Sequence, residues 1–188
     1  MTPKVAPYEK AIRMLLLLIV VGYIFQRLFP TVAASEVMGG LTGLSVGALL
    51  ACSLGAYKAY TELRRGFLYP LRTVSFYLGI FSVLIGVGWM AYEIAIGSPE
   101  AGQAVMWTAV LTGSFVLSMP YLYLDDVRLE HRIGFITTVL PIFGIQRIVE
   151  EEGRMLVRGN EGIEITVFEG QLGTERYYEL RERVNAIR

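Results

Sequence analysis

The stretch VMGGLTGLSVGALLACSLGAY, residues 37–57, decides the fold class of this chain. It contains no charged residue and is long enough to cross a bilayer, for which a helix needs about 20 apolar residues. Backbone N–H and C=O groups find no water in the hydrocarbon core, so a lipid-embedded segment of this length must be helical. The stretch therefore predicts a transmembrane helix.

Three further stretches have the same character, which gives four predicted spans at residues 12–28, 37–57, 74–96 and 104–124. Glu93 is the only charged residue inside the last three spans. Charged residues make up 18% of the whole chain, below the roughly 25% that is typical of soluble domains. We expect an α+β membrane protein with a four-helix transmembrane domain over residues 1–124.

The first span raises the alternative of a cleaved signal peptide. Basic residues precede it, and Val32-Ala33-Ala34 resembles a small-residue cleavage site. The approach to that site is long and bulky, because it includes Gln26, Arg27 and Phe29. This favours a retained helix, and cleavage would leave the orientation of the later spans unchanged.

The distribution of basic residues predicts the orientation of the spans. Arg27 is the only basic residue on one side of the predicted bundle. The other side has seven, in the N-terminal tail and in the loop between the second and third spans: Lys4, Lys10, Arg13, Lys58, Arg64, Arg65 and Arg72. Lysine and arginine in short loops favour the cytoplasmic side, so both termini are predicted to be cytoplasmic. Lys58, Arg64, Arg65 and Arg72 are candidates for contacts with anionic lipid headgroups.

The second span has a small residue at every fourth position, at Gly39, Gly43, Gly47, Ala51 and Gly55. Small residues at this spacing let two helix backbones approach closely in a membrane. Two interpretations remain open, which are packing within the four-helix bundle and a contact with another subunit.

Residues 43–47, GLSVG, also match the G-x-S-x-G pattern of serine hydrolases. That pattern functions at a strand-to-helix turn and needs a base. Here it lies inside an apolar helix, and the only histidine, His131, lies beyond the last span. We therefore predict no catalytic residue, no cofactor and no metal site, and we expect the chain not to be an enzyme.

The pattern changes after residue 124, so residues 125–188 are predicted to form a separate cytoplasmic β domain. Short alternating or β-branched runs at residues 127–130, 133–140, 145–150, 155–158 and 163–168 indicate strands. Residues 159–162, GNEG, are typical of a hairpin turn. Residues 174–187 follow as a predicted helix whose single apolar stripe is formed by Tyr177, Leu180, Val184 and Ile187.

Several motifs in this region resemble bacterial pleckstrin-homology-like (PH-like) domains. YLDDVRL at 123–129 resembles their opening strand, and RIG at 132–134 resembles the turn that follows it. Residues 140–148 resemble their next strand, and the runs at 153–157 and 162–167 resemble the following hairpin. The resemblance covers about a third of the chain. It implies a bacterial protein of the plasma (inner) membrane, with the domain at the cytoplasmic surface.

The resemblance has one clear departure, because a full PH-like domain has seven strands before its helix. Residues 125–188 offer only four or five. The alternatives are an abbreviated domain and a sheet that a neighbouring copy completes, since an unpaired edge would otherwise be exposed.

The charge of the β domain argues against a phosphoinositide site. Residues 125–188 contain no lysine, nine basic residues and twelve acidic residues, a net charge of −3. Their arginines alternate with acids, which indicates a solvated sheet face. Neither half of the chain is basic enough to suggest a nucleic acid partner.

Three functional hypotheses follow, and the first is favoured. It is a non-enzymatic membrane protein that presents a PH-like domain for protein interaction or assembly, as a homo-oligomer or a heteromeric membrane complex whose other partner is the lipid bilayer. The alternative is a small transporter or channel subunit, which would need polar groups along a path between helices. The third is a lipid-modifying enzyme that uses Asp125 and Asp126 at the inner interface.

Overall fold

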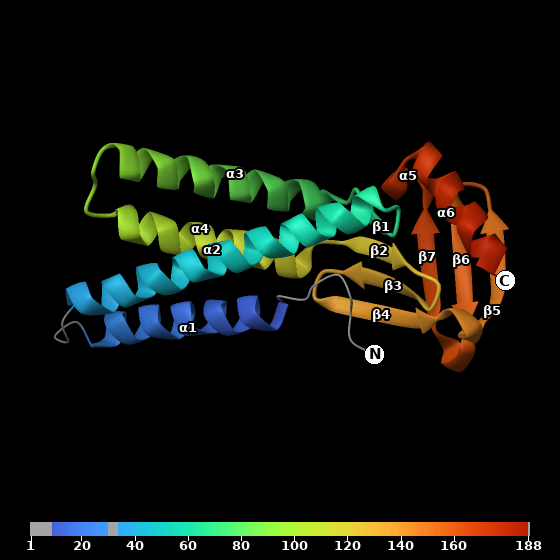
Figure 1. Cartoon of the computed structure of the whole chain (residues 1–188), viewed down its shortest axis with the longest axis horizontal. Coiled ribbons are helices and arrows are strands. Elements are labelled where there is room, and N and C mark those ends of the chain that lie inside the picture. Colours follow the sequence, from blue (N-terminus) through green and yellow to red (C-terminus); the bar gives the residue numbers. More distant parts are fainter. Residues whose placement is uncertain (1–8, 30–33, 188) are drawn as a thin grey trace. The chain divides into compact units, whose positions relative to one another are not determined.

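The computed structural model describes residues 9–29 and 34–187, and it divides into two compact units. The first, here called the helical unit, is formed by Ala6–Lys58 and Leu78–Leu117. The second, here called the sheet unit, includes Ala59–Tyr77 and Ser118–Arg188. Their elements are labelled in Figure 1. Val32 and Ala33 of the predicted cleavage-like site and the basic residue Lys4 lie outside the described residues.

Four long helices are present, and each is long and apolar enough to cross a membrane. They are α1 (Glu9–Leu28), α2 (Ala34–Arg64), α3 (Val74–Ala95) and α4 (Ala101–Ser118). The prediction of an α+β chain with four long apolar helices and a β-rich region is thereby confirmed, and the helices are compatible with a multi-pass membrane protein. α2 ends where Gly66 takes a φ of 75°, a left-handed conformation that glycine adopts without steric cost.

The fourth helix is shorter than predicted. It ends at Ser118, and residues 121–124, which we expected to complete the span, form strand β2 (Tyr121–Leu124). Pro120 explains the difference, because proline has no backbone N–H to continue a helix and biases the preceding residue away from helical conformation. The tyrosines that follow favour a strand.

Within the helical unit, α4 contacts the other three helices. Buried side chains of α1, α2 and α4 form its main core, which consists of Ile19, Leu41, Ala48, Met106 and Ala109. α3 also packs closely on α4, because a Cβ on Gly79 would come within 2.1 Å of the Phe115 ring of α4. α4 is therefore the central packing helix of this unit.

The sheet unit contains seven strands among its described residues, in two antiparallel sheets. The four-stranded sheet has the order β1 (Leu68–Pro70), β2, β3 (Arg128–Ile133) and β4 (Ile136–Pro141). The three-stranded sheet has the order β5 (Ile145–Glu151), β6 (Arg154–Gly159) and β7 (Glu164–Phe168). Short helix α5 (Glu169–Leu172) and helix α6 (Thr174–Ile187) complete the unit, with single 3-10 turns at Ile142–Gly144 and Asn160–Gly162.

The first strand does not come from the C-terminal region. β1 belongs to the loop between α2 and α3, and it pairs with β2 in the register Leu68 to Tyr123, Tyr69 to Leu122 and Pro70 to Tyr121. The Leu124 N–H also donates to the Phe67 carbonyl at 2.9 Å. Residues 125–188 contribute β3 to β7, which are the five strands expected there, and β1 and β2 come from outside that range. The sheet unit therefore also includes segments that precede residue 125.

One core joins both sheets and α6. β1 and the residue after it contribute Tyr69 and Leu71, and the helices contribute Leu172, Tyr177, Leu180 and Val184. The strands contribute Leu122, Leu124, Leu129, Leu140, Met155, Val157, Ile165 and Val167. The amphipathic C-terminal helix is confirmed at the positions that the structure describes.

Candidate functional surfaces

The small-residue stripe of α2 does not form one packing surface within the chain. A Cβ built on Gly39, Gly43 or Gly47 would meet no atom within 4 Å in the described structure. Ala51, in contrast, packs into the cluster around Cys52. Gly55 is buried. Bundle packing therefore does not account for the first three glycines, and a contact with another subunit stays a prediction.

Helix geometry explains why the stripe divides. An α-helix turns about 100° per residue, so positions four apart drift by about 40° at each step. Over the four steps from Gly39 to Gly55 the drift reaches roughly 160°, almost half of the helix circumference. The buried face of α2 instead follows alternating spacings of four and three residues, at Leu41, Ser45, Ala48 and Cys52.

The glycines that do bring helices together lie on the other spans. A Cβ would come within 2.6 Å of Leu41 if built on Gly22, and within 2.8 Å of Leu16 if built on Gly113. Between α3 and α4, the hydroxyl of Thr108 donates to the Gly86 carbonyl at 2.8 Å. These single glycines hold the bundle, and a search for regular spacing would not find them.

Most hydroxyls that could line a polar path bind their own helix instead. Four of those described donate to the carbonyl four residues earlier, at 2.7–2.9 Å: Thr42, Ser45, Ser53 and Ser82. The Thr108 hydroxyl has one proton and lies within hydrogen-bond distance of two carbonyls, those of Ala104 at 2.7 Å and Gly86 at 2.8 Å. Ser45 is the central residue of the G-x-S-x-G match and is fully buried in regular helix. A hydroxyl that is bonded in this way has its proton committed to the backbone.

The intramembrane acid also has a local partner. The indole N–H of Trp89 donates to Oε1 of Glu93 at 3.0 Å, one helical turn away on α3. Its placement at the headgroup level of the bilayer stays a prediction.

The four basic residues of the α2–α3 loop divide between the units. Lys58 belongs to the helical unit, whereas Arg64, Arg65 and Arg72 belong to the sheet unit and are exposed. The Arg64 guanidinium lies 5.2 Å from the centre of the Tyr60 ring. Arg65 forms an ion pair of 3.6 Å with Glu62. These exposed arginines leave contacts with lipid headgroups as a prediction.

An arginine of α6 fastens the β1 segment to the end of the chain. Arg183 donates to the Gly66 carbonyl and, at 3.1 Å, to the Tyr69 hydroxyl. Its guanidinium lies 5.3 Å from the centre of the Phe67 ring. The Tyr69 hydroxyl donates in turn to Oε1 of Glu179 at 3.4 Å, and burial raises the pKa of Tyr69. We call Arg183, Tyr69 and Glu179 the latch.

The sequence gives no sign of the latch, because Tyr69 lies more than 100 residues before Glu179 and Arg183 and no local pattern connects them. Sequence reasoning also misplaced two arginines of β3. Arg128 and Arg132 are buried, with 6% and 1% exposure, whereas Arg147, Arg154 and Arg158 are exposed as expected. Alternation of polar and apolar residues along a strand predicts two different faces, but it does not say whether the polar face is covered.

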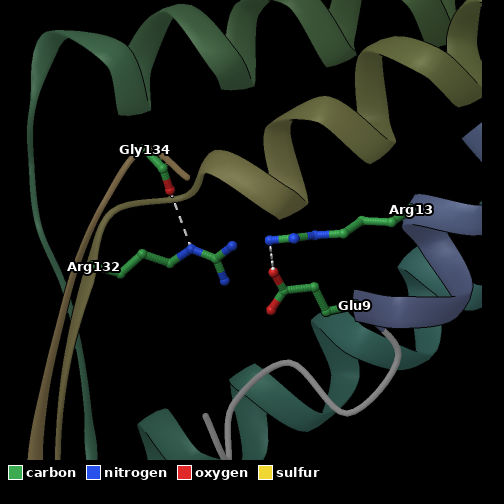
Figure 2. A network of polar contacts seen from close by, with 4 residues as sticks. All are labelled: Glu9, Arg13, Arg132 and Gly134. Atoms are coloured by element: carbon green, nitrogen blue, oxygen red, sulfur yellow. Dashed lines mark hydrogen bonds and ion pairs between the residues drawn. The ribbon is translucent and has the colours of Figure 1, made fainter. Parts of the chain in front are cut away.

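The buried arginines have partners on their own face of the sheet. Arg128 Nε lies 2.9 Å from Oε1 of Glu130. Arg132 Nε donates to the Gly134 carbonyl at 3.2 Å, and its guanidinium lies 5.7 Å from the centre of the Tyr121 ring. Figure 2 shows the Arg132 contact and, separately, the Glu9–Arg13 ion pair within α1.

The two aspartates proposed for lipid chemistry form the β2–β3 turn. Oδ1 of Asp125 accepts from the N–H groups of Val127 and Arg128 at 2.9 and 2.8 Å. Asp126 is exposed. Across residues 9–29 and 34–187, no three histidine, cysteine, aspartate or glutamate side chains group as a metal site. Asp125 thus has a structural role as the acceptor of a turn.

Comparison of the chain with family models, with curated proteins and with solved structures gives no match.

Proposed function

We propose that this chain is a non-enzymatic integral membrane protein of the bacterial plasma membrane, which presents a PH-like domain at the cytoplasmic surface for protein interaction or assembly. The observation that carries the proposal is the strand arrangement of the sheet unit. Four strands in the order β1-β2-β3-β4, three in the order β5-β6-β7 and a closing helix match the number that the resemblance implies for a full domain.

The origin of β1 supports a role in assembly at the membrane. The sheet is built from the α2–α3 loop and from the segment after α4, so the chain joins the domain to the spans at three points. A domain tied to the bilayer in this way cannot rotate freely on a single linker. Three connections limit the motion of the domain more than one linker would, which suits a module that holds a partner in place.

The exposed glycines of α2 support assembly between copies. Gly39 and Gly43 are exposed, and Gly47 is half-buried. Close approach of a second helix is the ordinary use of such glycines in membranes. The alternative of a transporter or channel receives less support, because hydroxyls of the spans donate to helix carbonyls.

The test is the mass of the protein after crosslinking in mild detergent. We expect a dimer or larger assembly, which Gly43→Leu and Gly47→Leu weaken. Gly88→Leu on α3 is the matched control, because a Cβ at Gly88 also meets no atom within 4 Å in the described structure. A monomer that purifies without any partner would contradict the proposal.

A further inference from the structure

The tip of the β3–β4 hairpin is apolar and exposed. The turn has only two residues, Gly134 and Phe135, and Gly134 takes a φ of 60°. Ile133, Phe135 and Ile136 are 61%, 63% and 75% exposed. Tight turns usually carry polar residues, glycine or proline, and no charged residue occurs in residues 133–138. Three large apolar side chains at one turn therefore need an explanation, unlike scattered apolar residues on a surface.

Strand register gives the position of this tip in the sheet. Tyr121 pairs with Arg132, and Arg132 pairs with Thr137. The tip thus extends from the end of the sheet at which β2 begins, and β2 begins three residues after the last residue of α4. Pro70, the last residue of β1, pairs with Tyr121 at the same end.

Chain connectivity keeps that end of the sheet near the bilayer. Four residues lead from Pro70 to the start of α3 at Val74, and three lead from Ser118 to Tyr121. One residue of extended chain spans at most about 3.6 Å. Two apolar helices, α3 and α4, are thus tied by short connections to the sheet end that carries the tip. α2 connects to the opposite end, at Leu68, but its apolar run ends at Tyr57, seven residues before the helix itself ends at Arg64.

One backbone carbonyl of the tip has a hydrogen-bond partner within the protein, which suits an environment with little water. A turn carbonyl that loses water without gaining a partner is costly in a lipid environment. Arg132 Nε donates to the Gly134 carbonyl at 3.2 Å, as Figure 2 shows. This bond satisfies one of the two turn carbonyls from within the protein.

The opposite end of the same sheet has a different character. It also exposes apolar residues, with Val127 at 51% and Phe143 at 81%, but Asp125 and Asp126 lie beside Val127 in the chain. Acidic residues are repelled by an anionic membrane surface. Phe143 is therefore a suitable control position for Phe135, because it is also an exposed phenylalanine but lies at the far end of the sheet.

We propose that the β3–β4 tip, with Ile133, Phe135 and Ile136, inserts into the interfacial layer of the lipid leaflet that faces the domain. The tip is then a further membrane anchor, and it fixes the tilt of the four-stranded sheet against the surface. The inference needs only that the chain is embedded in a membrane, so its failure would leave the proposed function intact.

The test uses the full chain with Cys52→Ser, reconstituted in vesicles of phosphatidylethanolamine and phosphatidylglycerol. A polarity-sensitive fluorophore is attached at Phe135→Cys or at the control Phe143→Cys. Interfacial apolar groups lie roughly 5–10 Å into the headgroup and acyl boundary, so a lipid with a shallow spin label should quench the first at least about twofold more than the second. Equal quenching at the two positions would overturn the proposal.

A second measurement needs no added fluorophore. It also tests whether the tip contacts a second copy of the chain and not lipid. In nanodiscs that hold one chain each, Phe135→Asp should accelerate amide hydrogen exchange in residues 128–141, whereas Phe143→Asp should not. Unchanged exchange with Phe135→Asp would overturn the insertion. Protection that appears only when several chains share a disc would assign the tip to contacts between copies and would equally overturn it.

Discussion

At the scale of single residues, Arg183 has the largest structural role outside the apolar core. One guanidinium satisfies a loop carbonyl and a tyrosine hydroxyl and lies over an aromatic ring. Gly66 and Tyr69, which accept these bonds, flank the start of β1. The side chain therefore joins the last helix of the chain to a loop that precedes it by more than 100 residues.

We predict that Arg183→Met destabilises the sheet unit by about 1–3 kcal/mol. The substitution removes the donor to the Gly66 carbonyl and the Tyr69 hydroxyl, and leaving a buried polar group without a hydrogen-bond partner costs about that much free energy. Arg181→Met on the same helix is the control. Arg181 forms an exposed ion pair with Glu150 at 3.3 Å, and surface pairs contribute about 0–1 kcal/mol. Chemical unfolding of the detergent-solubilised protein measures the free energy of unfolding of both variants. Equal losses would show that the latch does not contribute more to stability than a surface ion pair.

His131 gives a prediction of pH dependence. Burial lowers the pKa of this imidazole below its ordinary value, so the folded state binds its proton more weakly than the unfolded state. The stability from neutral His131 is therefore complete above the unfolded pKa, about 6.5, and is lost as the pH falls toward the lower folded value.

The measurement is the Tm of the protein at several pH values between about 5 and 8, on both sides of the ordinary histidine pKa. His131 is the only histidine in the chain, so His131→Gln should remove the part of the slope that lies near neutrality. A variant with the same slope as the original protein would show that this imidazole is not responsible.

At the scale of elements, packing of α3 on α4 depends on glycine. Phe115 occupies the space that a side chain at Gly79 would need, and Gly86 lies against Thr108 and Leu111. α3 exposes most of its other large side chains. The helix pair is thus held along a narrow line of contact, at which one added methyl group matters.

Gly79→Ala should therefore destabilise the helical unit, because its Cβ would come within 2.1 Å of the Phe115 ring and the ring would have to move. Gly88→Ala on the same helix should be neutral or stabilising, since alanine is favoured over glycine inside a helix by roughly 0.5–1 kcal/mol. Unfolding of the two variants in mixed micelles, monitored through the helical circular dichroism signal, gives the comparison. The interpretation fails if both substitutions have the same effect.

A second prediction at this scale concerns the segment that contains β1. Leu71 is 1% exposed and belongs to the core shared by both sheets. It and Tyr69 precede the other residues of that core by about 50 residues. Leu71→Ala should destabilise the sheet unit by roughly 2–5 kcal/mol, as is usual for a buried leucine. Val74→Ala, at a residue that is 75% exposed, is the control. Protease resistance of residues 118–188 reports the loss, and a resistance that Leu71→Ala leaves intact would mean that this unit folds without the loop.

At the scale of the whole molecule, the proposed orientation can be tested by labelling. In a Cys52→Ser background, a thiol introduced by Glu100→Cys lies in the exposed α3–α4 loop, and one introduced by Glu152→Cys lies in the exposed β5–β6 turn. The excess of basic residues on the side of the termini predicts a cytoplasmic location for Glu152. An impermeant maleimide added to intact cells should label the first thiol and spare the second. If only the Glu152→Cys thiol were labelled, the orientation would be the opposite of the one predicted.

Sequence alone determined the features that depend on composition and short-range periodicity. The four spans follow from runs of apolar residues that are too long for a soluble helix. The apolar stripe of α6 follows from Tyr177, Leu180 and Val184, whose spacing matches one face of a helix. The turn around Gly162 was recognisable because its φ value, 74°, is one that glycine adopts readily.

Tertiary structure decided the features that depend on contacts between distant segments. Leu68–Pro70 became a strand because β2 offered an unpaired edge, and nothing within three residues of sequence signals such pairing. Which face of α2 is buried depended on where the other helices lie, so regular glycine spacing could not tell that Gly39 and Gly43 lie outside the packing of this bundle. Arg128 and Arg132 are buried for the same reason. Local patterns fix the period of a helix or strand, whereas burial is set by whatever the rest of the chain brings against it.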